Sequence, residues 1–169
     1  AYKNEYTLPS EPVSIVLSKQ GWVRCLKGKV DDLKDLKFKD EDSLFISINA
    51  NSNDKIIFFS SNGKAYSLDV SELPSGRGHG TPLKILLDIE EQHSVISVFP
   101  FENEKKYIVA SSEGNGFIVN SNDMLSNRKS GKQVLNLKDN QKSIICKKII
   151  GDSVVAIGKN KKMLIFSLN

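Results

Sequence analysis

The sequence predicts an all-β fold of about four small, radially repeated sheets, as in propellers and pinwheels. The first observation is a unit that occurs four times, in which three apolar residues lead into a tight turn and a second apolar run follows. The turns fall at positions 21, 63, 114 and 161, so the unit recurs at intervals in the forties to low fifties. The second observation is that strand signals dominate the chain. Blades bury their own interiors, so function is expected on loops and rims.

Short apolar or alternating runs are expected to form the strands, because Gly, Asn, Ser and Asp separate them at regular intervals. Several runs have four or five apolar residues with little alternation, which is typical of strands that are covered on both faces. The expected strands are 13–17, 22–26, 44–48, 55–59, 65–70, 85–89, 95–99, 106–110, 116–120, 134–137, 143–150, 153–157 and 163–168.

The hairpin turns have residues that suit them. Asn62 and Gly63 form a strong turn pair, because both residues tolerate a positive φ. Gly21 and Gly114 take the matching place in the first and third copies. The fourth copy has Lys161 there, so its turn is expected to be looser, and Gly151-Asp152 supplies a turn just before that copy.

The whole chain, residues 1–169, is expected to be one domain. Longer polar connections at 27–42, 72–82 and 122–132 join the repeats, and no Pro-, Gly- and Ser-rich linker divides them. The chain starts at Ala1 rather than at Met, so a fragment of a longer protein is expected, and its first residues lack the pattern of a secretion signal. No run approaches the roughly 20 apolar residues that span a bilayer, so no membrane partner is expected.

Composition restricts the chemistry. The net charge of +4 and the pI of about 9.0 are compatible with a polyanionic partner. Cys25 and Cys146 are far apart, so buried thiols in a reducing compartment are expected rather than a disulfide or a metal site. His79 and His93 have no partners at metal-ligand spacing. Nucleophile-elbow, zinc-protease and P-loop motifs are absent from the sequence, so catalysis by this chain is not expected.

Two basic loops are the candidate binding elements. Segment 75–80, Ser-Gly-Arg-Gly-His-Gly, fits either a phosphate cradle or a flexible crossover between blades. Segment 127–132, Asn-Arg-Lys-Ser-Gly-Lys, falls at the equivalent place in the next repeat. Arg77 and Arg128 follow their respective hairpin glycines at the same interval, so both are expected on one rim. A repeated cation along a curved rim suits a phosphodiester backbone that is bound without base reading.

Other cations near the turns extend this candidate site. Lysines near the fourth turn fit either DNA binding or an ordinary solvated face. The aromatic residues Trp22, Tyr66 and Phe117 lie at or near equivalent strand positions and are expected to pack between blades. The predicted DNA-binding residues are Arg24, Lys27, Lys29, Arg77, His79, Arg128, Lys129, Lys132, Lys161 and Lys162.

These segments resemble the carboxy-terminal domain of the topoisomerase IV A subunit. Residues 9–13 and 18–24 are similar to its opening, and 73–83 and 127–132 are similar to its inter-blade loops, so the likeness covers nearly the whole chain. The related domain of the gyrase A subunit carries a basic box, Gln-Arg-Arg-Gly-Gly-Lys-Gly, that this sequence lacks, which favours topoisomerase IV.

The resemblance implies a β-pinwheel of four-stranded blades that binds and bends duplex DNA on its basic outer rim. In that family the domain recruits and orients DNA for a bacterial, cytoplasmic, nucleoid-associated enzyme. The partners implied are double-stranded DNA, the enzyme's ATPase subunit, and the catalytic core to which the domain is joined. Cleavage chemistry, Mg²⁺ and ATP belong to other parts of that enzyme, so no cofactor is expected in this domain.

Two departures from the family concern ring closure. Four hairpin copies imply fewer blades than the five or six of relatives, and Lys161 replaces the last turn glycine. The sequence is therefore compatible with either a closed ring or an open crescent. The rival function is a protein-interaction propeller that grips peptides at its central face. A continuous positive rim favours DNA, and an apolar central patch favours protein.

Overall fold

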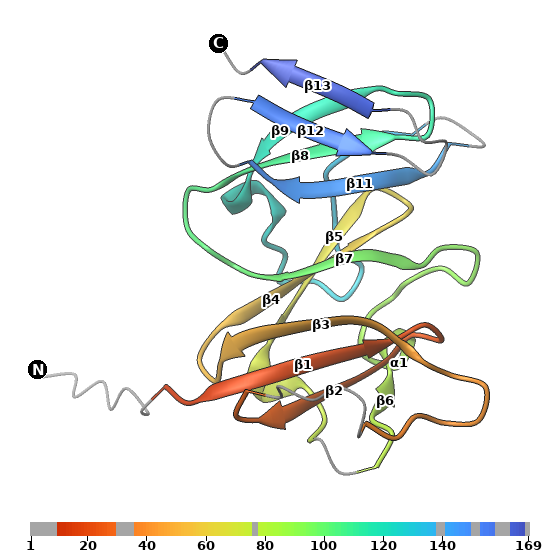
Figure 1. Ribbon diagram of the computed structural model, residues 1–169, viewed down its shortest axis with the longest axis vertical. Coiled ribbons are helices and arrows are strands. Elements are labelled where there is room, and N and C mark those ends of the chain that lie inside the picture. Colours follow the sequence, from red (N-terminus) through yellow and green to blue (C-terminus); the bar gives the residue numbers. More distant parts are fainter. Residues whose placement is uncertain are drawn as a thin grey trace, which may run out of the picture.

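The computed structural model describes residues 10–29, 36–75, 78–137 and 141–149, together with the backbone of 153–157 and 163–167. Within these ranges the strands form four antiparallel sheets, named A to D, in the order of the chain (Figure 1). In sheet A the spatial order is β3 (Leu44–Asn51), β1 (Pro12–Ser18), β2 (Trp22–Lys27) and β6 (Thr81–Pro82). In sheet B it is β10 (Lys132–Gln133), β5 (Lys64–Asp69), β4 (Lys55–Ser60) and β7 (Val95–Pro100).

The later sheets are smaller. Sheet C has β11 (Ser143–Lys148), β8 (Lys106–Ser111) and β9 (Gly116–Asn120), and the described part of sheet D consists of β12 (Ser153–Ile157) and β13 (Met163–Ser167). Among the described residues, three short helical turns follow β5, β6 and β9: η2 (Val70–Glu72), α1 (Leu83–Leu86) and η3 (Ser121–Met124). The expected four strands per blade are therefore found in sheets A and B, but not in the described parts of sheets C and D.

Neighbouring sheets exchange strands. The chain leaves the β4–β5 hairpin of sheet B, returns to sheet A and pairs there as β6, with Thr81 opposite Val23. In the same way the chain leaves the β8–β9 hairpin of sheet C and pairs in sheet B as β10, with Lys132 opposite Ala65. Each of these two-residue strands closes the outer edge of the preceding sheet.

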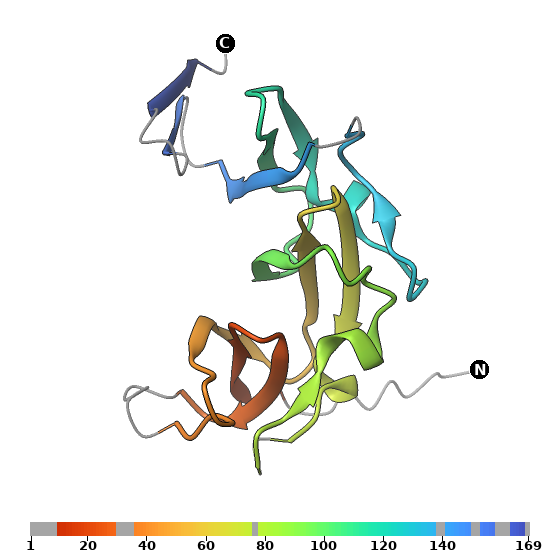
Figure 2. The same ribbon diagram turned by 90° about the vertical axis from the view of Figure 1, so that its right-hand side faces the viewer.

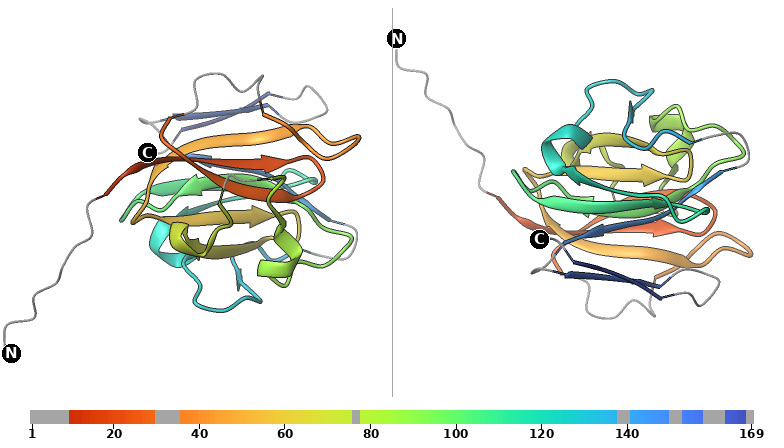
Figure 3. Two further views of the ribbon diagram at one scale, coloured as in Figure 1. Left: turned by 90° about the horizontal axis from the view of Figure 1, so that it is seen from below. Right: turned by 90° about the horizontal axis from the view of Figure 1, so that it is seen from above.

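The sheets follow one another along an arc that does not close into a ring (Figure 2). Seen along the long axis, successive sheets overlie one another (Figure 3). The green and cyan segments that follow β5 and β9 lie on the same side in these views, which is the convex side of the arc. Of the two outcomes left open by the sequence, the structure shows the crescent.

The hydrophobic core lies between adjacent sheets, because central strands are buried on both faces. Strand β4 alternates between two clusters: Ile56 and Phe58 face sheet A, whereas Ile57 and Phe59 pack with residues of sheet C. All four side chains have 0% exposure. The continuous apolar run therefore reflects burial on two sides, as the sequence predicted.

Most predicted strands are confirmed, with two errors. Segment 85–89 was expected to be a strand, but the Leu87 amide bonds to the Leu83 carbonyl and closes the helical turn α1 directly after Pro82. Segment 134–137 was also expected to be a strand, but the pairing residues are the polar Lys132 and Gln133 just before it. The short strands β6 and β10 were not predicted, because two residues are too few for a periodic signal.

The turn prediction is confirmed where the structure describes it. Gly21, Gly63 and Gly114 have φ values of 85°, 79° and 87°, and each amide bonds at 3.0 Å to the serine carbonyl three residues earlier. The predicted turns at Gly151-Asp152 and at Lys161 lie outside the described residues. Of the two cysteines, both free, Cys146 is buried and Cys25 is half-buried.

In the part of the chain that the structure describes, no helix has the length and apolar character needed to cross a bilayer.

Candidate nucleic-acid interface

The candidate interface is made by two inter-hairpin segments that return to the preceding sheet. We call residues 73–80 the first rim loop and residues 125–131 the second rim loop; residues 76 and 77 of the first lie outside the described part. In the first loop, Ser75 forms a bridge with Cys25, and the Cys25 amide bonds to the Pro74 carbonyl at 2.9 Å. In the second, the Ser126 amide bonds to the Ser67 hydroxyl at 3.1 Å. Ser75 and Ser126 hold the same position relative to their hairpin glycines, as do Cys25 and Ser67, so the loops are equivalent.

Each rim loop ends in a glycine that sits directly on the preceding sheet. Gly80 and Gly131 lie at the same distance in sequence from their hairpin glycines and have positive φ values of 90° and 73°. A Cβ on Gly80 would overlap the Val23 carbonyl, and a Cβ on Gly131 would lie 2.8 Å from ring carbons of Tyr66. Only glycine satisfies both the backbone conformation and the close approach. Sequence reasoning used the equal spacing of the arginines and missed the equal spacing of these glycines, although both were visible.

Arg24 supports the first rim loop from below rather than facing solvent. Its side chain is only 5% exposed, and its Nη1 donates a 2.6 Å hydrogen bond to the Gly78 carbonyl. Its guanidinium also lies 5.3 Å from the centre of the Phe38 ring. Nη2 is buried and has no partner among the described residues. Arg24 was predicted to bind DNA, but its guanidinium is committed to holding the loop.

Tyr66 takes the equivalent place beneath the second rim loop. Its ring is fully buried under Gly131, and its hydroxyl donates to the Asp88 carbonyl at 3.4 Å and accepts from the Asn62 amide at 3.2 Å. Burial raises the pKa of this hydroxyl. The Asp88 amide in turn bonds to the Lys129 carbonyl at 2.9 Å, so the backbone of the second loop is anchored on both sides.

The remaining predicted cations that the structure describes are exposed. Lys27 and Lys29 lie at and just beyond the end of β2, His79 lies in the first rim loop, and Arg128, Lys129 and Lys132 lie in or next to the second. Among the described residues, the ion pairs are His93–Glu90 and Lys148–Glu102, so no described carboxylate forms an ion pair with these rim cations. The charged side chains of the lysines and of Arg128 are therefore accessible to an anionic ligand. Arg77, Lys161 and Lys162 lie outside the described residues.

The surroundings of the second rim loop are mixed in charge. Lys55, Arg128 and Lys129 line a hollow of about 230 Å³ together with Asp69 and Glu72. The Glu72 carboxylate accepts a 2.9 Å hydrogen bond from the Asp69 amide, which occupies one of its oxygens with the η2 turn. Asp69, Glu72 and Arg128 are all exposed, so acidic and basic side chains lie together beside the second rim loop.

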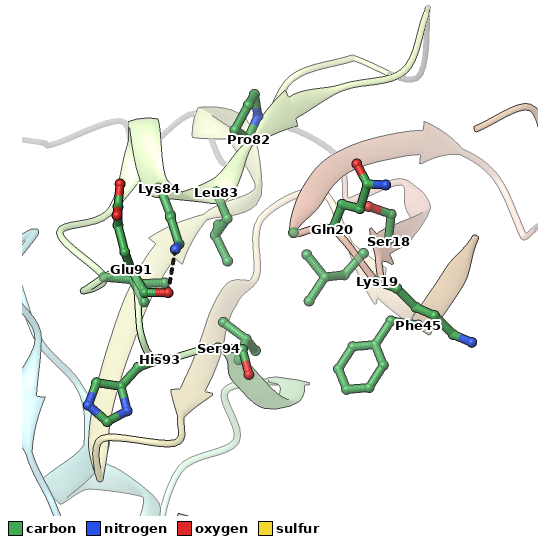
Figure 4. Close-up of a pocket in the computed structure, with 14 residues that line it drawn as sticks. Ser18, Lys19, Gln20, Phe45, Pro82, Leu83, Lys84, Glu91, His93 and Ser94 are labelled. Atoms are coloured by element: carbon green, nitrogen blue, oxygen red, sulfur yellow. Dashed lines mark hydrogen bonds between the residues drawn. The ribbon is translucent and has the colours of Figure 1, made fainter. Parts of the chain in front are cut away.

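A larger cavity lies elsewhere, between sheets A and B at the β1–β2 turn. It measures about 520 Å³ and has an apolar wall that includes Leu17, Leu83 and the 44%-exposed Phe45. Polar side chains also line the cavity, and among them the Lys84 ammonium donates a 3.1 Å hydrogen bond to the Glu91 carbonyl (Figure 4). The cavity therefore offers a partner shape and apolar surface.

The described residues do not form a metal site, since no group of three or more His, Cys, Asp or Glu side chains among them could hold an ion.

His93 bonds through Nδ1 to the buried Ser61 hydroxyl at 2.9 Å. The same hydroxyl accepts the Ser94 amide at 3.2 Å, which makes it a linker between β7 and the β4–β5 turn.

These features define a class, a propeller-like repeat domain with strand exchange between blades and cationic loops on its outer rim. The family model described as "DNA gyrase C-terminal domain, beta-propeller" matches residues 54–102 and 105–142. The chain belongs to this family.

The sequence is also similar to the A subunits of several bacterial DNA topoisomerases 4. The chain is 43% identical over 164 residues to the A subunit of DNA topoisomerase 4 from Caulobacter vibrioides and 34% identical over 164 residues to that from Escherichia coli K12. It covers 22% of each relative, with 97% and 96% of this chain aligned. The match supports the resemblance to topoisomerase IV, and the chain corresponds to about a fifth of that subunit.

Solved structures agree with this placement. The E. coli ParC C-terminal domain superposes with a TM-score of 0.81 at 32% identity, over 94% of this chain and 65% of that one. The C-terminal domain of a DNA topoisomerase IV superposes with a TM-score of 0.75 at 20% identity, over 96% of this chain and 53% of that one. At this identity the similarity shows a shared fold and nothing more.

Proposed function

We propose that this domain binds duplex DNA along its outer rim, without sequence preference, and bends it. On this proposal it recruits and orients DNA for a type IIA topoisomerase, topoisomerase IV, and its partners are the catalytic core and the ATPase subunit. The observation that carries the proposal is the equivalence of the two rim loops. Two consecutive sheets hold a loop at the same place on the convex side. The second loop has the exposed Arg128 and Lys129, which form no ion pair with a described carboxylate, and the first has Arg77 in its sequence, outside the described residues.

The physical basis is neutralisation of phosphates. Lysine and arginine side chains that contact phosphates release condensed counterions, so affinity depends strongly on salt. Such contacts position a duplex and carry no sequence information. A curved row of cations favours bent DNA, because bending brings further phosphates to the rim. The rim has the chemistry for this task, and on this proposal the Mg²⁺ and ATP chemistry of the parent enzyme lies in its other parts.

The test is a salt titration with several unrelated linear duplexes, measured by fluorescence anisotropy. If the footprint neutralises about four to six phosphates, log affinity should fall against log salt with a slope of roughly −4 to −5. Replacing Arg128 and Lys129 by alanine should weaken binding. Replacing Lys147, an exposed lysine on β11 at the opposite edge of its sheet from β9, should not. Absence of binding at low salt would refute the proposal. Energy transfer between dyes at the duplex ends tests bending separately.

A protein-interaction scaffold is the second candidate, because the 520 Å³ cavity between sheets A and B has an apolar wall. The two functions are separable by mutation. Phe45→Ser would remove apolar surface from the cavity without touching a rim cation, so it should leave DNA affinity unchanged. A loss of partner binding in this variant, with intact DNA binding, would favour the scaffold function.

A further inference from the structure

The helical turns that precede the two rim loops each carry a carboxylate at the same place. Turn η2 begins directly after β5 and η3 directly after β9, in the segments that follow these strands on the convex side of the arc (Figure 3). The third residue of each turn is acidic, Glu72 in η2 and Asp123 in η3. These residues precede Arg77 and Arg128 by the same interval in the sequence. Acidic turns and basic loops therefore alternate along the chain.

The geometry of the turns explains why these carboxylates face solvent. A 3-10 turn has three residues per turn, so residues three apart in sequence lie on the same side of it. Val70 and Leu73 are both buried, as are Ser121 and Met124. The acidic residue between each buried pair is left on the outer side and is exposed. Local packing thus determines where these negative charges lie.

The carboxylate of η2 lies beside the cations of the second rim loop. Glu72 and Asp69, the last residue of β5, line the same hollow of about 230 Å³ as Arg128 and Lys129. All four side chains are exposed. The ion pairs among the described residues involve none of the four. Because the opposite charges lie close together without being paired, a phosphate that approaches the loop interacts with both kinds.

We infer that Asp69 and Glu72 limit how tightly the second rim loop binds DNA, because their carboxylates repel the phosphates that Arg128 and Lys129 attract. The inference rests on the proposed DNA binding and concerns the regulation of its strength. A hollow of this volume is about as wide as the Debye length at physiological salt, roughly 8 Å, so dissolved ions screen the repulsion only in part. A phosphate in contact with either cation therefore lies within range of both carboxylates.

Sheet A has the opposite charge at the corresponding position. Lys27 at the end of β2 and Asp69 at the end of β5 follow their hairpin glycines at the same interval, and both are exposed. The corresponding residue of sheet C is the neutral Asn120. The two rim loops are therefore alike in backbone but unlike in electrostatic surroundings. DNA is bound more weakly at the second loop than its two cations alone would allow, so a duplex can leave this loop while the rim of sheet A retains it.

The experiment replaces the carboxylates by amides, which removes charge and keeps shape. Glu72→Gln retains an oxygen that can accept the Asp69 amide, which bonds to Glu72 at 2.9 Å. In anisotropy titrations of the polypeptide at its natural full length, we expect the double variant with Asp69→Asn to bind a linear duplex about fourfold more tightly at low salt, about twofold for each carboxylate. This gain should shrink as salt rises. It should also disappear in a background with Arg128→Ala and Lys129→Ala, where no cation draws phosphates to the loop.

The matched control is Glu41→Gln. Glu41 is an exposed carboxylate just before β3, which lies at the opposite edge of sheet A from β6. The substitution changes the net charge by the same amount as Glu72→Gln, so it should leave DNA affinity unchanged if position on the rim decides the effect. An equal gain from Glu41→Gln, or a gain that persists without Arg128 and Lys129, would overturn the inference.

A reciprocal pair of variants leaves the hydrogen bonds of η2 untouched. Ser71 is exposed and precedes Glu72 on the turn. Ser71→Glu adds a negative charge there and should weaken binding about twofold relative to Ser71→Gln. If the double variant unfolds, this pair decides. Equal binding by the two Ser71 variants, or no gain in a folded double variant, would refute the inference while leaving the proposed function intact, provided that the wild type binds DNA. Absence of binding by the wild type and every variant would refute both.

Discussion

Gly131 lies against the ring of Tyr66 so closely that a Cβ at this position would stand 2.8 Å from the ring carbons Cδ1 and Cε1. The contact joins the last residue of the second rim loop to strand β5 of sheet B. Because Gly80 approaches Val23 in the same manner, each basic loop is fixed by a glycine that touches the neighbouring sheet. The placement of the cations thus depends on residues that carry no charge.

Gly131→Ala should displace the second rim loop. Two costs add: a non-glycine residue at φ 73° is strained by roughly 1 kcal/mol, and the Cβ overlap with Tyr66 adds about 1–3 kcal/mol. Thermal unfolding should show the loss of stability, and DNA affinity should fall although every cation is retained.

Gly114→Ala is the matched control for this substitution. Its φ is 87°, but nothing lies within 4 Å of the added Cβ, so only the backbone strain applies. If both variants lost equal stability, the contact with Tyr66 would have no role in holding the loop.

Arg24→Ala should reduce stability and Lys27→Ala should reduce DNA affinity, although both remove one positive charge from β2. Arg24 is 5% exposed and bonded to the Gly78 carbonyl, so its loss should destabilise the fold by about 1–3 kcal/mol and speed hydrogen exchange in residues 78–80. Lys27 is exposed, so its loss should change stability by less than about 0.5 kcal/mol and should weaken DNA binding at low salt. Urea unfolding measures the stability of both variants, and fluorescence anisotropy measures their affinity for DNA. Equal stability in both variants would contradict the supporting role of Arg24.

The hairpin repeat and the strands were predictable because their signals are local. A glycine at a fixed place and a continuous apolar run, such as 56–59, report turn conformation and two-sided burial directly. The strands β6 and β10 were not predictable, because two polar or proline-containing residues become strands only where a preceding sheet offers its edge. The role of Arg24 was missed for the same reason: an arginine in a basic cluster looks alike in sequence whether it faces solvent or a loop carbonyl.

Arg128→Ala should weaken binding to unrelated duplexes by the same factor and reduce the salt slope by about 1. The reason is that an exposed guanidinium on a rim reaches phosphates, which are the same in every sequence. Anisotropy titrations with duplexes of different base composition check this. A loss confined to one sequence would instead indicate base contact.

Asp42 should make stability depend on pH through the β1–β2 turn. Although partial burial alone would raise the pKa of its carboxyl, hydrogen bonds from the Ser18 hydroxyl and from the Ser43 and Gln20 amides hold it below the usual value. A carboxyl with a lowered pKa in the folded state stabilises the fold above its unfolded pKa, near 4, and that contribution is lost as pH falls through the lowered value. The free energy of unfolding of the wild type should therefore decrease as pH falls below about 4, and Asp42→Asn should remove part of this decrease. The measurement is urea unfolding at a series of pH values from neutral to 2.5, with Asp40→Asn as the control, because Asp40 is an exposed carboxylate two residues away. Identical pH profiles for wild type and Asp42→Asn would show that the bonds to Ser18, Ser43 and Gln20 do not stabilise the turn.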